Sequence, residues 1–236
     1  MHRLVSLLVV ALAAAAFTTG SATAARTAKV TPGATLRAFV EAAGKGDVPR
    51  LWALLSKQTQ RRLGPDLAGF RKGRAVELTA GVGAFARSGG YRVGLAEKLS
   101  ESWAIAVITG PRHVEGRTEA GVYGIALRGD GAVWRLELGG PVRLRILGPK
   151  AGEVIARPGP QTAVEVQAPT AIEGAVLYAD GKPIDARSGG TSASAVTFFG
   201  NATGVKAKGL HFAAAIAVTA TEGSAVAWAF RLAPVR

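Results

Sequence analysis

The spacing of apolar residues changes near residue 90, and this change constrains the fold more than any other feature. Between residues 36 and 43, apolar side chains recur at the three- and four-residue intervals of an amphipathic helix. Between residues 91 and 99 they alternate with polar or small residues, which is the period of a half-buried strand. Helices followed by antiparallel strands predict an α+β layer for the first part of the chain.

The helical part contains an abrupt break. Gly44 and Gly46 are expected to end the first helix, because glycine adopts the left-handed conformation of a C-terminal cap at little cost. Asp47 is expected to cap a second helix, with Pro49 in its first turn, and Ser56 to cap a third, short helix. The break is expected to turn the chain so that both leading helices face one sheet.

Three further strands are predicted after the first one. They cover residues 103–109, 122–127 and 133–138, and a loop is expected over residues 110–120. The last two are joined through Asp130-Gly131, a pair typical of tight hairpins.

Gly139-Gly140-Pro141 marks the predicted end of the first domain. No convincing helical pattern follows, and short apolar stretches separated by turn pairs such as Asp180-Gly181 and Glu222-Gly223 predict a β-sandwich. The expected strands are 142–147, 163–168, 175–179, 183–186, 195–199, 210–219 and 225–232.

The N-terminus has the pattern of a secretory signal peptide. Arg3 precedes an uncharged run from Leu4 to Phe17, and Ala22-Thr23-Ala24 has the form of a cleavage site. The apolar run is shorter than the roughly 20 residues of a spanning helix. We therefore expect a signal peptide over 1–24, a polar leader over 25–31, and a secreted or extracytoplasmic protein without a transmembrane segment after cleavage.

The charge and the cysteine content limit the kinds of partner and ligand that the chain can bind. The chain has no cysteine, so it has no disulfide, no lipid-bearing cysteine and no thiolate metal site. Its formal net charge is +13, which attracts anionic surfaces and polymers. The positive charges are dispersed, and behind a signal peptide nucleic acid is not an expected partner. Anionic envelope polymers or another envelope protein are the expected partners, and the oligomeric state is left open.

Both halves resemble known families. The stretches TLRAFVEAAGKGDVPRLWALLSKQTQRRLG, SWAIAVITGPR and VYGIALRGDGAVWRLEL resemble the nuclear transport factor 2-like superfamily, in particular its secreted or envelope-associated bacterial members. The stretches VRLRILGPKAGEVI, AVLYADGKPID and GLHFAAAIAVTATEGSAVAWAFRL resemble bacterial immunoglobulin-like domains. The resemblance implies an α+β cone over residues 32–140, with N-terminal helices on a curved antiparallel sheet. It implies an all-β immunoglobulin-like sandwich over residues 141–236.

A cone of this kind can enclose a pocket. Its expected lining is aromatic, with Tyr91 or Tyr123 as a polar group for a ligand. The alternative is that these aromatic residues fill the cone as ordinary core. The candidate ligand-binding residues are Phe39, Trp52, Phe70, Tyr91, Trp103 and Tyr123.

Three other ionisable residues give weaker evidence for a functional site. Glu97 interrupts an apolar alternation, His113 is expected in a charged loop, and His211 begins a strand. The two histidines are far apart in sequence and do not predict a zinc site. No catalytic residue, metal site or cofactor is predicted.

Three classes of function are considered from the sequence, and the first is the leading hypothesis. The first is a non-enzymatic, secreted bacterial cell-envelope protein whose modules bind or space other components. The second is a small-molecule binder, or an enzyme of the lyase or isomerase type, that uses the pocket of the first domain. The third is adhesion to anionic envelope polymers, which predicts salt-sensitive binding spread over many lysine and arginine side chains.

Overall fold

A computed structural model describes residues 30–140, 142–155, 163–190, 194–201 and 208–233. The predicted signal peptide and most of the predicted leader lie outside the described residues. Six helices precede the first strand in the described part of the chain. They are α1 (Pro32–Lys45), α2 (Val48–Leu54), α3 (Lys57–Leu63), α4 (Leu67–Lys72), α5 (Arg74–Gly81) and α6 (Gly83–Ser88).

The helix break is confirmed, with one correction. Gly46 ends α1 in the left-handed conformation (φ 67°), and the Asp47 side chain accepts a hydrogen bond from the Arg50 amide at the start of α2. The prediction that Gly44 also ends the helix is wrong, because Gly44 lies inside α1. A Cβ on Gly44 would come within 2.5 Å of the Ala86 Cβ, so the glycine permits close contact between α1 and α6.

Gly83 on α6 lies in the same close contact between α1 and α6. A Cβ there would lie 2.6 Å from the Ala43 carbonyl oxygen, which is backbone and cannot rotate away. We expect Gly83→Ala to separate the two helices and to lower the free energy of unfolding by about 1–3 kcal/mol. Chemical denaturation would measure this loss. Gly81→Ala is the matched control, since no atom lies within 4 Å of its Cβ position, and an equal effect of both variants would contradict the packing argument.

Thirteen strands among the described residues form three sheets. The first sheet, in the order β1-β2-β3-β4, contains β1 (Arg92–Lys98), β2 (Trp103–Val114), β3 (Arg117–Asp130) and β4 (Val133–Glu137). The second, β6-β13-β12-β8-β9, contains β6 (Val154–Ile155), β8 (Gly174–Ala179), β9 (Lys182–Ile184), β12 (Gly209–Val218) and β13 (Gly223–Leu232). The third, β10-β11-β7-β5, contains β5 (Arg145–Gly148), β7 (Ala163–Pro169), β10 (Ala186–Gly189) and β11 (Ala195–Asn201).

The hairpin of β2 and β3 is longer than predicted. The expected loop over 110–120 is strand on both sides of a tight turn at Glu115 and Gly116, both of which have positive φ (49° and 76°). His113 therefore lies on β2, where its Nδ1 is 3.2 Å from the Thr118 hydroxyl of β3. The predicted hairpin at Asp130-Gly131 is confirmed.

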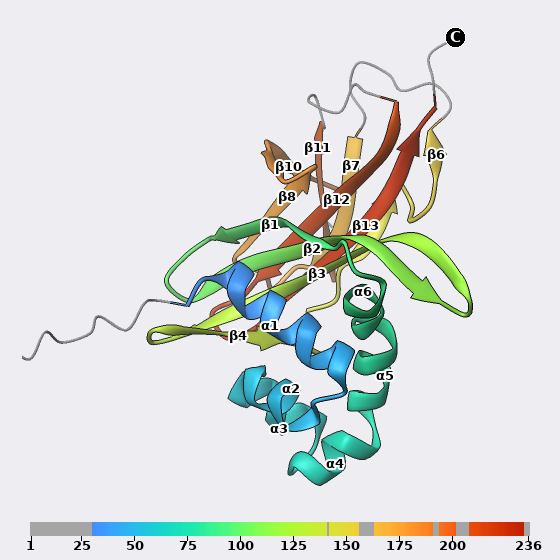
Figure 1. Cartoon of the computed structure of the whole chain (residues 1–236). Coiled ribbons are helices and arrows are strands. Elements are labelled where there is room, and N and C mark those ends of the chain that lie inside the picture. The colour runs from blue at the N-terminus through green and yellow to red at the C-terminus, as the bar shows by residue number, and fades with distance from the viewer. Residues whose placement is uncertain (1–29, 141, 156–162, 191–193, 202–207, 234–236) are drawn as a thin grey trace, which may run out of the picture.

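The predicted fold class is wrong. The chain is mostly β and is built as four layers: the helices, the first sheet, the second sheet and the third sheet (Figure 1). The first sheet does not form the wall of an open cone, because both faces of this sheet are buried. One face carries Ala106 and Ile108 against the helices, and the other carries Ile105 and Val107 against the second sheet. The second half of the chain is likewise not a separate immunoglobulin-like sandwich, because one of its sheets packs on the first sheet.

The second sheet likewise has two apolar faces. On β12, Ala214 and Ile216 pack toward the first sheet, whereas Ala213 and Ala215 pack toward the third. Successive residues of a strand point to opposite faces, so an almost continuous apolar run produces this double burial. The halves of the chain therefore share a core, and the division near residue 140 remains a prediction.

Candidate functional site

Three of the predicted lining residues lie together in the core between the helices and the first sheet. Phe39 and Phe70 are fully buried, and Trp52 packs against them as a partly buried residue. The ring centroids of Trp52 and Phe70 are 5.1 Å apart. Trp52 and Phe70 are therefore in ring contact, and Phe39 lies in the same core.

Tyr91 and Tyr123 pack at the margin of the same core. Tyr123 borders a hollow of about 210 Å³ with Arg74, Leu78 and Phe85. Burial raises the pKa of Tyr123 to about 12, and the nearby positive charge of Arg74 opposes that rise. Burial, followed by the negative charge of Glu41, also raises the pKa of Tyr91.

Trp103 lies apart from the other five predicted residues. Its ring lies so close to Gly223 on β13 that a Cβ there would approach it to 2.4 Å. The guanidinium carbon of Arg128 lies 4.7 Å from the centroid of the Trp103 ring, a cation–π distance. Trp103 therefore belongs to the contact between the first and second sheets.

Glu97 also points toward the second sheet. It follows Leu95 and precedes Leu99 on one face of the strand, and both leucines pack in the core between the first and second sheets. Burial, and then the charge of Glu97, raise the pKa of the fully buried Tyr178. Glu97 is thus the acidic neighbour of a buried phenol on β8.

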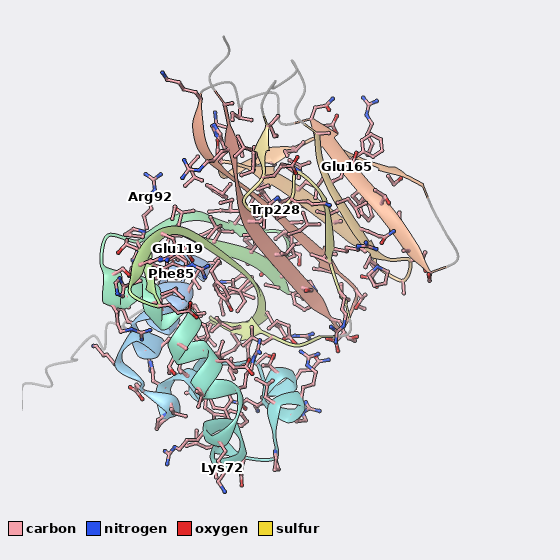
Figure 2. All side chains as sticks on the ribbon, turned by 90° about the vertical axis from the view of Figure 1, so that its right-hand side faces the viewer. Lys72, Phe85, Arg92, Glu119, Glu165 and Trp228 are labelled. Carbon is pink, nitrogen blue, oxygen red and sulfur yellow. The ribbon has the colours of Figure 1, made fainter. Side chains whose placement is uncertain are left out.

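A groove of about 730 Å³ opens between the first sheet and the second. Its walls are residues of β1, β2 and β3 on one side and the start of β12 with the β8–β9 turn on the other. Figure 2 shows Arg92 pointing away from the helices, on the side of the first sheet where the strand carrying Trp228 lies. The lining residues are Gly90, Arg92, Val93, Gly94, Thr109, Gly110, Ala120, Gly121, Val122, Asp180, Leu210, His211 and Phe212.

The β8–β9 turn is fixed against β12 by Asp180. Its Oδ1 accepts the Phe212 amide hydrogen at 3.0 Å, and its Oδ2 lies 2.7 Å from the Nδ1 of His211. The Asp180 amide in turn donates to the Phe212 carbonyl at 2.9 Å. Asp180 has positive φ (47°), a conformation that aspartate tolerates in hairpin turns. Both carboxylate oxygens of this groove residue therefore hold the wall in place.

Arg62, Glu137 and Glu222 form an ionic cluster that does not line the groove. Arg62 pairs with both carboxylates, and Arg128 reaches Glu137 at 3.4 Å. Gln58 donates to Glu222 as well. Since Glu222 precedes β13, the cluster connects α3 and the first sheet to the second sheet.

The groove was not found from the sequence. Asp180-Gly181 was recognised as a turn, but nothing in the pattern indicated that this turn abuts β1. A Cβ on Gly181 would lie 2.7 Å from the Gly94 carbonyl oxygen, so the site depends on a contact between distant strands. Within the described residues, no group of three or more acidic, histidine or cysteine side chains is placed to hold a metal ion.

The comparisons with known proteins do not assign the chain to a family. No known family and no curated protein matches it. An endo-β-1,4-mannanase from Thermotoga petrophila aligns over 40% of this chain and 20% of its own, with 13% identity and a TM-score of 0.31. The titin Ig tandem domains A164-A165 align over 60% of this chain and 90% of theirs, with 7% identity and a TM-score of 0.27. At these scores the likeness carries no argument about this chain.

Proposed function

We propose that the protein is a secreted, extracytoplasmic component of a bacterial cell envelope that binds a ligand without transforming it. The supporting observation is the groove of about 730 Å³ between the first and second sheets. Its size is within the range of sites for small organic ligands, and it combines apolar walls with a few polar groups. The signal-peptide pattern in residues 1–24 supports the compartment. No helix in the described part of the chain has the length and apolar character to cross a membrane.

The chemistry of the groove favours binding over catalysis. Its carboxylate, Asp180, is engaged through both oxygens by Phe212 and His211, so it is held as a structural acceptor. A general base must instead be able to reach a substrate proton. The exposed polar group at the first-sheet wall is Arg92, which binds and orients anions but does not exchange protons near neutral pH.

A small-molecule site at Tyr123 is the second candidate. The hollow there measures about 210 Å³, below the usual size of ligand pockets. With its pKa at about 12, Tyr123 is protonated at neutral pH and can donate a hydrogen bond but cannot serve as a base. The hollow is therefore better suited to binding a small polar ligand than to catalysing a lyase or isomerase reaction. Of the two sites, the groove has the stronger support.

Filling the groove tests the proposal. Ala120 is exposed on β3 and borders the groove, so Ala120→Trp should block it without disturbing the core. Val76→Trp, on the exposed face of α5, is the matched control. We expect native mass spectrometry of protein recovered from the extracytoplasmic fraction to show a bound species on the wild type and the control that is lost from Ala120→Trp.

Two results would overturn the proposal. One is that the wild type and both variants carry the same species or none. The other is saturable turnover of an envelope component that disappears with Ala120→Trp. The same preparation checks the compartment, because cleavage of the predicted signal peptide leaves Ala25 at the N-terminus of the mature chain.

A further inference from the structure

The groove continues beyond Leu210 into a second hollow. This hollow measures about 380 Å³ and shares Ala120, Gly121, Val122 and Leu210 with the first. It extends along β13 to Arg231 and to the turn at Ala151-Gly152. Together the two hollows form an elongated cleft, called here the inter-sheet cleft. An elongated shape is suited to an extended chain.

Strand alternation shows which side chains of the second sheet face the cleft. Phe212 packs in the core against the first sheet, so Leu210, two residues earlier, points to the same side. Leu210 is 44% exposed and pairs with Arg231 across β12 and β13, which places that arginine beside it. Val122 completes an apolar floor from the side of the first sheet.

Each of the two hollows has an exposed arginine in its lining. Arg92 lines the first hollow and Arg231 the second, and both are exposed. No acidic side chain in the part of the chain that the structure describes forms a salt bridge with either arginine.

The acidic residues of the cleft are already paired. Asp180 is bound by His211 and the Phe212 amide, and Glu119 pairs with Arg112 at 2.5 Å. Both carboxylates are thus engaged by groups of the protein itself. The cleft lining carries three arginines, Arg92, Arg112 and Arg231, against two carboxylates, so its formal charge is positive. The formal net charge of +13 adds a long-range attraction of the same sign.

We propose that the inter-sheet cleft binds an extended acidic polysaccharide, a chain of sugar rings carrying carboxylate groups. The rings present apolar C–H faces to Val122, Leu210 and Phe212, while carboxylates reach Arg92 and Arg231. A polyphosphate supplies the charge but no apolar face, and an uncharged glycan supplies the faces without the charge. This inference rests on the proposed function, because it names the ligand class of the same groove.

Oligogalacturonates of one, three and six units are suitable probes, with isothermal calorimetry on the mature chain. We expect affinity to rise with length, to exceed that for a neutral maltohexaose, and to fall by about tenfold or more between 50 mM and 500 mM NaCl. Arg92→Gln and Arg231→Gln should each weaken binding of the hexamer about fivefold. Arg187→Gln removes an equally exposed strand arginine outside the cleft and should leave affinity unchanged.

Leu210 provides a second test that does not remove a cation. Because it borders both hollows and is exposed, Leu210→Glu introduces a negative charge at the centre of the cleft with little risk to folding. We expect this variant to lose at least about tenfold more affinity than Leu210→Gln, which has the same shape without the charge.

The outcomes separate the inference from the proposed function. Equal affinity for the acidic and neutral hexamers, or preference for a polyphosphate of matched charge, overturns the acidic polysaccharide as ligand. If Ala120→Trp still loses a different native ligand, the groove remains a binding site and only the ligand class is wrong. Binding of the hexamer that is unaffected by Ala120→Trp and by both Leu210 variants places the polysaccharide elsewhere and also overturns the inference.

Discussion

Replacing Glu137 with glutamine is expected to lower the free energy of unfolding by about 2–4 kcal/mol. The Glu137 side chain is fully buried, and its two oxygens face Arg62 and Arg128. Among the described residues, removing the charge leaves Arg128 without a carboxylate partner and Arg62 with Glu222 alone. Breaking a buried ion pair typically costs about 3–5 kcal/mol, and the expected value is lower because the arginine side chains are 22% and 27% exposed.

Unfolding of the mature chain with guanidinium chloride measures this loss in the free energy of unfolding. Glu77→Gln is the matched control, since Glu77 pairs with Arg74 on the exposed surface of α5, and its loss should change stability by no more than about 0.5 kcal/mol. A Glu137→Gln variant as stable as the control would show that the cluster of Arg62, Glu137 and Arg128 does not stabilise the fold.

Local features were predictable from the sequence where neighbouring residues determine them. The caps at Gly46, Asp47 and Ser56 were found because each uses a side chain or a backbone conformation within a few residues. The hairpin at Asp130-Gly131 was found for the same reason. The turn at Glu115 and Gly116 was missed, because a glutamate with positive φ is not a usual turn signal.

The fold class was missed for a different reason. The stretch from Trp103 to Ile108 is apolar at every position, and all of it is buried. A strand with one solvated face alternates between apolar and polar residues, whereas an unbroken apolar run indicates burial on both faces. That run therefore contained a signal for a sheet packed on each side.

The groove depends on contacts between distant strands, and no pattern in the sequence indicates these contacts. The predicted lining residues are aromatic side chains at core spacing, and three of them, Phe39, Trp52 and Phe70, lie in one core. The groove instead lies between β1, β2 and β3 of the first sheet and the start of β12 with the β8–β9 turn. Its position depends on how far two sheets overlap, which no local pattern encodes.

Ile216→Ala is expected to destabilise the helical layer as well as its own sheet. Ile216 is fully buried on β12 and packs in the core shared by the first and second sheets. Truncating a buried isoleucine to alanine costs about 2–5 kcal/mol, through lost burial and the cavity that remains. Since the first sheet also packs on the helices, loss of this contact should be transmitted to all three layers.

Hydrogen exchange followed by mass spectrometry resolves the effect by segment. If the layers unfold as one cooperative unit, the slowest amides of β2 and of β12 should lose the same free energy of protection in Ile216→Ala. Val76→Ala, at a 61% exposed position on α5, should alter neither segment. Faster exchange in β12 with unchanged exchange in β2 would mean that the two halves unfold independently despite their common core. That result would support the predicted division near residue 140, whereas equal loss in both strands would show that the shared core joins the halves into one folding unit.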